Sequence, residues 1–535
     1  MTLSARLGIF CLFATPAPCV CFKALQGTGS PSLVQRQKKP PTSQTVVGAS
    51  LSESSSSDEE CSVCIIGGGV SGLAAAITIG ERESCCSDDD DDEHQSIILL
   101  EAGPTIGGRV QSDKTDDGYT LDRGFAVFLE EYPNSKALLD YDALDLCPFD
   151  PGALVKLSDN GPGGLSRVAD PLRQPKRLWS AATSPVGTVK DKVRLVPLLV
   201  HVMKKSIDEL FAEEETDTLT CLTERWRFSR PFIDGFLAPF LEGIYLTPLD
   251  QQSSRMFHFV FKMFSVGNVS LPRRGIGAVS EQLAAKAKSL GVDIRTNCAV
   301  ETIRAEQEEE EGFTVTTQSG RKIHAENVIL ATDVKSATHM ILSLAGNDQI
   351  ADFDDAVIER SVGCLYYTFD SEPPIDEPIL VLNGAKGRGT RDSPINNVCF
   401  PSVVCSDYSP RSGSHLCSVS ILEKSLEEYS RKDDELDFAV RRQLSRWFPS
   451  HADAIIDPDT WRLKRIYRVD GAQPAQFGCS YPANANGGRD ATSFRGAKVP
   501  RGMVVAGDHI STSSLNGALG SGIVAGEAVI NSIKK

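Results

Sequence analysis

Acidic residues are missing from the first 52 positions of this 535-residue chain, and no segment is apolar for long enough to cross a bilayer. The acid-free stretch carries five cations, so the remainder has a formal net charge of −16 − 5 = −21. This negative charge argues against a nucleic-acid partner and against electrostatic adhesion to an anionic membrane. A peripheral membrane contact of another kind stays compatible with it. The length suffices for two domains or more.

Patterns typical of metal sites and disulfide frameworks are also missing. The eight histidines are dispersed, and Cys61-x-x-Cys64 has no second CxxC to complete a zinc site. Because Cys64 lies inside an apolar run, we expect this pair to pack in the core. Three of the fifteen cysteines lie near the N-terminus, and the others are scattered through expected strands and helices. We therefore predict neither a metal site nor oxidative cross-links.

The N-terminal segment has the character of a targeting leader. A short apolar run over Leu7–Ala14 is followed by prolines and then by a Ser/Thr/Gln/Lys-rich stretch without acids. A signal followed by transit-like sequence resembles the two-part leaders that direct proteins into plastids. Secretion and mitochondrial import are the alternatives. Residues 1–60 are expected to be this leader and a disordered linker, with the folded protein beginning near Cys61.

A glycine-rich turn stands between an expected strand and an expected helix. The run Ser62-Val-Cys-Ile-Ile precedes Gly67-x-Gly69-x-x-Gly72, and a second apolar strand ends in Glu101. In a dinucleotide-binding β-α-β unit, Gly67 allows the turn, Gly69 lets the backbone approach the pyrophosphate, and Gly72 lets the helix pack on the strand. Glu101 would accept a ribose hydroxyl and repel a 2′-phosphate, which favours FAD or NAD over NADP. A glycine turn used for packing alone is the alternative.

The spacing between Gly72 and Glu101 is longer than usual in such units. The excess is explained by residues 84–95, whose paired cysteines and acidic run suit neither helix nor strand. We expect a solvated loop there. Farther on, residues 118–128 alternate like a strand beside the cofactor.

Aromatic residues gather between positions 132 and 264, where the pattern changes to helices with apolar stripes. Pro231 and Pro239 predict a kink or two short helices. The stripe either packs in the core or lines an apolar substrate tunnel. Its members are Phe228, Phe232, Phe236, Phe240, Phe257, Phe259, Phe261 and Phe264.

The later sequence returns to the dinucleotide-binding pattern. A helix is expected over 278–290, strands over 292–296 and 327–332, and a hairpin around 306–312. A buried strand from Met503 ends in Gly507-Asp508, and an Ala/Gly-rich helix opens near Ser514. The dipole at that helix N-terminus would stabilise negative charge on a reduced cofactor.

These motifs together resemble the FAD-dependent amine oxidase and phytoene desaturase superfamily, over essentially the whole chain from Cys61. The resemblance rests on the glycine turn, Glu101, Gly107-Gly108-Arg109, Leu121-Asp-x-Gly124 and the C-terminal strand and helix. It implies noncovalent FAD, because Ser513-Ser514-Leu515 stands where monoamine oxidases carry the flavin-linked cysteine. Arg109 would contact FAD phosphate, or else would merely pair with local acids. The cofactor-binding residues implied together are Gly67, Gly69, Gly72, Glu101, Gly108, Arg109, Val300 (at the adenine), Gly507, Asp508 and Asn516.

The expected fold class is α/β, with a discontinuous Rossmann-like FAD-binding domain and a second, α+β substrate domain. The first would comprise residues 61–130, 268–350 and 491–535, and the second residues 131–267 and 351–490.

The expected function is FAD-dependent oxidation or isomerisation of an apolar small molecule, most like a carotenoid or isoprenoid desaturase or isomerase. The alternatives are an amine oxidase, a protoporphyrinogen-type oxidase, or a flavin- or pigment-binding protein without turnover. The cofactor carries the difficult chemistry in such enzymes, so the sequence assigns no catalytic residue. His509, beside Asp508, is expected to be structural.

Overall fold

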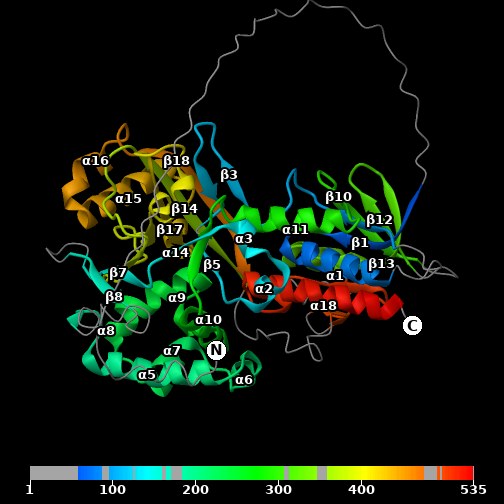
Figure 1. Cartoon of the computed structure of the whole chain (residues 1–535), viewed down its shortest axis with the longest axis horizontal. Coiled ribbons are helices and arrows are strands. Elements are labelled where there is room, and N and C mark those ends of the chain that lie inside the picture. The colour runs from blue at the N-terminus through cyan, green and yellow to red at the C-terminus, as the bar shows by residue number, and fades with distance from the viewer. Residues whose placement is uncertain are drawn as a thin grey trace, which may run out of the picture. The chain divides into compact units, whose positions relative to one another are not determined.

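Two seven-stranded sheets organise the part of the chain that the structure describes (Figure 1). The structure is a computed structural model, and it describes residues 58–86, 95–124, 127–158, 164–169, 183–306, 312–345, 358–474, 491–494 and 497–533. These belong to one compact unit, residues 56–535. The predicted leader and most of the predicted loop over 84–95 lie outside the described residues.

The first sheet has the order β10-β2-β1-β13-β12-β11, with β21 also paired to β13. Strands β10, β2, β1, β13 and β21 are parallel, whereas β12 forms antiparallel pairs with β11 and β13. Strands β2 and β21 and the last four residues of β1 and β13 are buried at consecutive positions, as in parallel sheets covered on both faces, which explains their apolar sequences. The strands are β1 (Glu59–Ile66), β2 (Ile97–Leu100), β10 (Asp293–Arg295), β11 (Val300–Ala305), β12 (Phe313–Thr317), β13 (Lys322–Leu330) and β21 (Met503–Val505).

Helices α1 (Val70–Cys86), α11 (Gly277–Ser289) and α18 (Leu515–Ile533) share one hydrophobic core on this sheet. Small residues let α1 and α18 approach closely. A Cβ atom on Gly522 would lie 2.2 Å from the carbonyl oxygen of Ser71, and one on Gly526 would lie 2.9 Å from Cβ of Thr78. The other face is covered by α12 (Val334–Ala345). The first and last helices of the described chain are therefore packed together.

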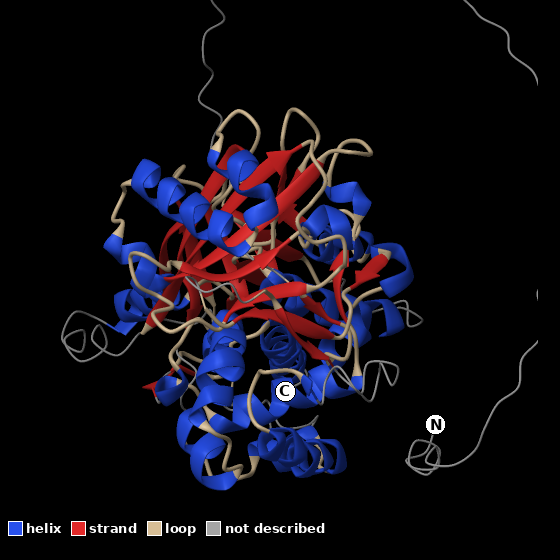
Figure 2. Cartoon of the chain, turned by 90° about the vertical axis from the view of Figure 1, so that its left-hand side faces the viewer, coloured by secondary structure: helices blue, strands red, loops and turns tan. Residues whose placement is uncertain are grey.

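The second sheet has the order β18-β14-β17-β16-β15-β7-β8. Neighbouring residues of one strand face different cores. Leu154 and Val381 pack with α15 (Asp433–Trp447), whereas Val155 and Leu382 pack with the helices from α5 (Val189–Lys204) to α10 (Ser254–Val266). Helices accordingly flank both faces of the strands (Figure 2). The strands are β7 (Gly152–Lys156), β8 (Ser166–Ala169), β14 (Glu359–Phe369), β15 (Leu380–Asn383), β16 (Ile395–Cys399), β17 (His415–Leu422) and β18 (Arg462–Pro474).

The helical region on the second sheet contains two π-helical segments, η3 (Cys221–Arg225) and η4 (Ile233–Leu237). The segment η4 joins α8 (Arg230–Phe232) to α9 (Ala238–Tyr245). Pro231 and Pro239 both lie in the first turn of an α-helical piece, where proline is tolerated. The predicted interruption is thus present. The neighbouring helices are α5 (Val189–Lys204), α6 (Ile207–Phe211), α7 (Thr218–Thr220) and α10 (Ser254–Val266).

Three sequence predictions on local structure are wrong in part. Residues 132–264 are not only helical, because β6 (Leu146–Pro148), β7 and β8 lie among them. Residues 118–128 do not form one strand: β4 (Thr120–Asp122) and β5 (Phe128–Leu129) are separate, and Gly118 and Gly124 have φ of +92° and +98°. Finally, α1 continues through Ser84 to Cys86, within the range expected to be a loop.

The strands of the two sheets come from different ranges of the chain. Every strand of the first sheet falls within 61–130, 268–350 or 491–535, apart from the first two residues of β1. Every strand of the second sheet falls within 131–267 or 351–490. A small third sheet, β5-β9-β6, crosses this division, because β9 (Val269–Pro272) pairs with β6.

Candidate cofactor and substrate site

The glycine turn lies at the carboxyl end of β1, and its three glycines differ in their surroundings. Gly67 has a φ of +111°, and a Cβ there would lie 2.5 Å from the carbonyl oxygen of Ala331. A Cβ on Gly72 would lie 2.1 Å from the carbonyl oxygen of Gly67. A Cβ on Gly69 would meet no atom within 4 Å. Gly67 and Gly72 are thus required by packing, whereas the space in front of Gly69 is open to a ligand.

Glu101 lies directly after β2 and faces the turn. Its Oε2 accepts a hydrogen bond from the N–H of Gly68 (2.8 Å), and its Oε1 accepts one from the N–H of Gly103 (2.7 Å). Each carboxylate oxygen retains a further acceptor position. The carboxylate is therefore held in place and can still accept a ribose hydroxyl.

The segment before β11 runs alongside Glu101. The N–H of Cys298 donates to the carbonyl oxygen of Glu101 (2.8 Å), and the N–H of Asn297 donates to that of Gly103 (2.8 Å). Val300 begins β11 two residues later. Val300 therefore lies two residues from a segment that is hydrogen-bonded to Glu101, and the resemblance places the adenine at Val300.

The paired glycines and Arg109 connect the turn to the C-terminal motif. The N–H of Gly107 donates to the carbonyl oxygen of Gly68 (2.8 Å), and a Cβ on Gly108 would lie 3.5 Å from Cα of Gly69. Arg109 forms an ion pair with Asp508 (2.6 Å) and donates to the carbonyl oxygen of Ala472 (3.0 Å). The charge of Asp508 is the main cause that raises the pKa of Arg109. Two residues 399 positions apart, both predicted to hold FAD, therefore meet.

Gly507 and Asn516 lie on either side of the turn into α18. Gly507 has a φ of +153°, and its N–H donates to Ser521 Oγ (2.8 Å). Asn516 is fully buried, its Oδ1 accepts from the N–H of Asn134 (3.0 Å), and its carbonyl oxygen accepts from Asn134 Nδ2 (2.8 Å). Its Nδ2 is buried without a hydrogen-bond partner. A buried donor of this kind at a helix N-terminus suits a ligand that supplies an acceptor.

Other residues singled out by sequence have structural surroundings. Cys61 and Cys64 are buried in the core of the first sheet, which confirms that they pack there. His509 packs edge-on against Phe494, with ring centroids 5.7 Å apart. Neither observation assigns these residues a chemical role.

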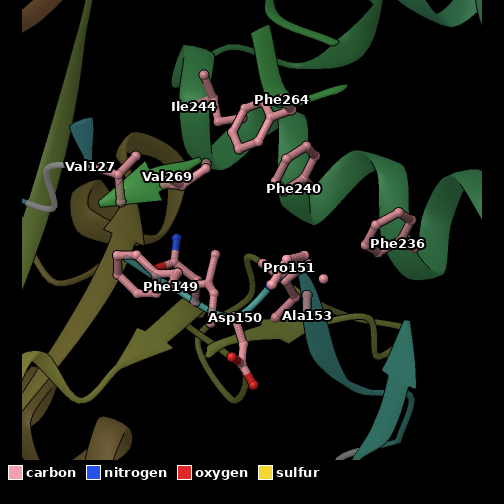
Figure 3. Close-up of a pocket in the computed structure, with 15 residues that line it drawn as sticks. Val127, Phe149, Asp150, Pro151, Ala153, Phe236, Phe240, Ile244, Phe264 and Val269 are labelled. Atoms are coloured by element: carbon pink, nitrogen blue, oxygen red, sulfur yellow. The ribbon is translucent and has the colours of Figure 1, made fainter. Parts of the chain in front are cut away.

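A cavity of about 170 Å³ lies between the second sheet and the helices η4, α9 and α10 (Figure 3). One wall consists of the rings of Phe236, Phe240 and Phe264. The opposite wall includes Phe149, Pro151 and Ala153, and Figure 3 shows these two groups facing each other. The carboxylate of Asp150 points away from the three rings.

The predicted phenylalanine stripe divides between the core and this cavity. Five rings form one row of contacts, with successive ring centroids 5.3, 5.7, 5.9 and 5.0 Å apart. In order along the row they are Phe228, Phe232, Phe236, Phe240 and Phe264. The first two rings are buried, and the last three line the cavity. Phe257 and Phe259 are also buried. The stripe thus lies partly in the core and partly in the lining of a cavity.

Asn397, on β16, is a polar side chain in the cavity lining that the sequence did not indicate. The residue is 1 % exposed, and its Oδ1 is buried without a hydrogen-bond partner. The signal was a pair of asparagines inside an otherwise apolar strand. The neighbouring Asn396 is satisfied, because its Nδ2 donates to the carbonyl oxygen of Pro239 (3.1 Å).

The sequence also missed a cluster formed by His201, Glu213 and His258, whose possible metal-ligand atoms lie within 4.8 Å of one another. Lys205 and Arg225 form ion pairs with the same carboxylate. Burial acts to raise the pKa of Glu213, but hydrogen bonds from His258, Arg225 and Lys205 outweigh it and hold that pKa well below its usual range. Two fixed cations on its only carboxylate make this cluster an ion-pair network rather than a cation site.

The cofactor residues gather where four parallel strands end. The glycine turn follows β1 and Glu101 follows β2. Ala331 follows β13, and Gly507 lies just after β21. Ligands of doubly wound sheets bind at this edge, and the open face of Gly69 leaves room for the phosphates. The fold and the site thus define a dinucleotide-binding protein of the Rossmann class.

Comparison with known proteins identifies the family. The family model described as flavin containing amine oxidoreductase matches residues 70–530, and the chain belongs to this family. The chain is accordingly a FAD-dependent oxidoreductase with an α/β fold. A search of curated proteins found no match.

Solved structures share this fold. A putative protoporphyrinogen oxidase from Exiguobacterium sp. 255-15 has a TM-score of 0.60 at 18 % identity, over 90 % of this chain and 100 % of its own. Cyclohexylamine oxidase from Brevibacterium oxydans IH-35A has a TM-score of 0.59 at 14 % identity, over 89 % and 100 %. Putrescine oxidase bound to putrescine has a TM-score of 0.56 at 14 % identity, over 88 % and 99 %.

Proposed function

We propose that this FAD-dependent oxidoreductase dehydrogenates or isomerises an apolar small molecule of the carotenoid or isoprenoid type. The observation that carries the proposal is the wall of Phe236, Phe240 and Phe264 over the cavity. FAD, when bound, supplies a two-electron acceptor, and the protein supplies position and electrostatics. We further propose that FAD is held noncovalently by the ten residues inferred from the sequence, in a domain separate from the substrate domain.

The aromatic wall is physically continuous with the start of α18. Leu515, the first residue of that helix, packs against the core of the first sheet. It also packs against the core that the helices from α5 to α10 form on the second sheet, which we call the aromatic core. Tyr132 stacks on Phe259 (5.9 Å), and Asn134 binds Asn516. A substrate against the rings would therefore lie near the helix N-terminus that we assign to the flavin.

The size of the cavity favours a slender substrate. Its volume of about 170 Å³ is below the roughly 300–1,000 Å³ of sites that enclose a whole drug-sized ligand. The enclosed part of the cavity has room for one end of an isoprenoid chain. The Oδ1 of Asn397 is a hydrogen-bond acceptor without a partner, so the enclosed end is expected to carry a donor such as a hydroxyl group.

Amine oxidation is the second candidate. Two of the similar structures are oxidases of amines by name, and Asp150 contributes a carboxylate near the cavity. Because that carboxylate points away from the rings, it is poorly placed to attract an ammonium group at the wall. A protoporphyrinogen-type reaction has the support of one similar structure by name.

The cellular location is a separate proposal. We propose that residues 1–60 direct the protein into a plastid, supported by their apolar run and acid-free, hydroxyl-rich sequence. Carotenoids would be present there. Among the described residues, no helix is long and apolar enough to cross a membrane.

The test is anaerobic reduction of the FAD-loaded protein by candidate substrates, followed by absorbance and product analysis. Polyenes or isoprenoid alcohols should bleach the flavin or be isomerised, and Phe236→Asp should impair this while FAD stays bound. Phe438→Asp is the matched control, because Phe438 is 61 % exposed on α15. Rapid bleaching by monoamines or polyamines, with no conversion of any polyene, would overturn the proposal.

A further inference from the structure

Helix α5 carries apolar residues on two opposite sides. Leu198 and Val202 are buried against the aromatic core. On the other side Val189, Val193, Val196 and Val200 are 71, 64, 60 and 45 % exposed. Their spacing of four, three and four residues places them on one face. A surface helix of a globular protein usually presents polar residues there.

This face is unusual within the molecule. The described residues contain eight exposed large hydrophobic side chains, and four of them are these valines. We call the four the valine stripe. The other four are dispersed over the chain at Ile358, Phe438, Ile456 and Ile533. Single exposed apolar residues need no explanation, but a continuous stripe marks an interaction surface.

The charges around the valine stripe fit a lipid surface. Lys190 and Lys204 are exposed on α5, one near each end of the stripe. The only acid of the helix, Asp191, is buried and accepts hydrogen bonds from Thr188 and Ser229. Basic residues around an apolar face are typical of helices that lie in the membrane interface.

Contact with lipid would depend mainly on the apolar side chains. Asp208 and Glu209 are exposed on α6, which follows α5 directly, so local basic charge is partly offset. The strongly negative net charge of the chain also opposes adhesion by charge alone. An uncharged bilayer surface should therefore be sufficient.

The position of α5 suits such a contact. The helix lies along the outer edge of the helical region, away from β14 and β17 (Figure 1). Asp191 binds Ser229, which adjoins Phe228, the first ring of the row that ends at the cavity. Gly187, just before α5, also contacts that row, because a Cβ there would lie 2.5 Å from the ring of Phe232.

From these observations we propose that the valine stripe docks on a lipid bilayer, with α5 lying in the plane of the interface. The row of rings then leads from the membrane-facing helix to the cavity. The docking itself does not depend on the reaction assigned above, so vesicle binding tests it separately from substrate turnover.

The experiment is co-sedimentation of the FAD-loaded full chain with phosphatidylcholine vesicles. Val193→Asp/Val196→Asp and the uncharged Val193→Ser/Val196→Ser should each lower partitioning about a hundredfold, since each valine contributes about tenfold. The matched control is Phe438→Asp/Ile456→Asp, which changes two exposed apolar residues elsewhere and should bind like the wild type. Every variant chain retains the leader, so differences between them report on α5.

Light scattering without vesicles identifies a competing occupant. If the wild type is a larger assembly and the valine variants are not, the stripe is an interface between copies, and the proposal is wrong. Equal sedimentation of wild type and both valine variants would also overturn it. Loss of FAD or of thermal stability in the variants is not expected, because all four valines are exposed.

Discussion

The second and third glycines of the turn allow cofactor binding to be separated from folding. Gly69→Ala places its Cβ where no atom lies within 4 Å, and the φ of Gly69 is not positive. The unliganded protein should therefore keep its stability. Gly72→Ala places its Cβ 2.1 Å from the carbonyl oxygen of Gly67, so the helix or the turn must move.

The expected magnitudes differ accordingly. Overpacking of this kind costs about 1–3 kcal/mol, which Gly72→Ala should lose with or without FAD. In wild type, FAD at about one hundred times its Kd should add about 2.7 kcal/mol to the free energy of unfolding. Gly69→Val should lose this gain, because its side chain fills the space expected for the pyrophosphate, and Gly69→Ala should lose part of it.

The assay is chemical unfolding with and without FAD, together with the absorbance of FAD released on denaturation. Wild-type FAD content in Gly69→Val would show that the pyrophosphate does not lie in front of Gly69. Wild-type stability of Gly72→Ala without FAD would show that the close contact with Gly67 does not constrain the helix.

Two further predictions concern charged residues. Asp508→Asn should lower FAD affinity about ten- to a hundredfold by titration, because Arg109 then lacks the carboxylate that fixes its position. The unliganded protein should lose only about 1 kcal/mol, since Arg109 is 38 % exposed. Glu213→Gln should cost about 2–3 kcal/mol at pH 7. The depressed pKa of Glu213 stabilises the wild type above the unfolded pKa of about 4.3. That contribution is lost as the pH falls below this value, so the difference between variant and wild type should shrink in acid; an unchanged difference would contradict the network.

The cofactor site could largely be predicted because its signals are local. Gly67 and Gly72 occupy fixed positions in one strand, turn and helix, Glu101 follows the next strand, and the backbone conformation of Gly67 admits no ordinary side chain. The pairing of Arg109 with Asp508 is different, since no local pattern joins residues 399 apart. Only the resemblance to a family placed both at one cofactor.

The remaining differences have physical causes. Strand β7 is buried at four consecutive positions, so it lacks the alternation that distinguishes a strand from a short buried helix. His201, Glu213 and His258 come from separate elements, and their meeting depends on tertiary packing. The valine stripe on α5 follows helical spacing, but spacing alone does not reveal which of two apolar faces is buried.

Because η4 is π-helical, the lining of the cavity can change through the deletion of a residue as well as through substitution. A π turn closes its hydrogen bond over one residue more than an α turn. Deleting one residue within Ile233–Leu237 would restore α-helical winding, and the helix beyond would keep nearly the same rotation, because the lost residue and the narrower turn compensate each other. Phe240 would then stay at the cavity wall, and the change would fall on the residues of the π turn itself, among them Phe236. Chains that differ by a single residue in length here are therefore expected to differ at the Phe236 end of the cavity, even where their cofactor motifs are identical.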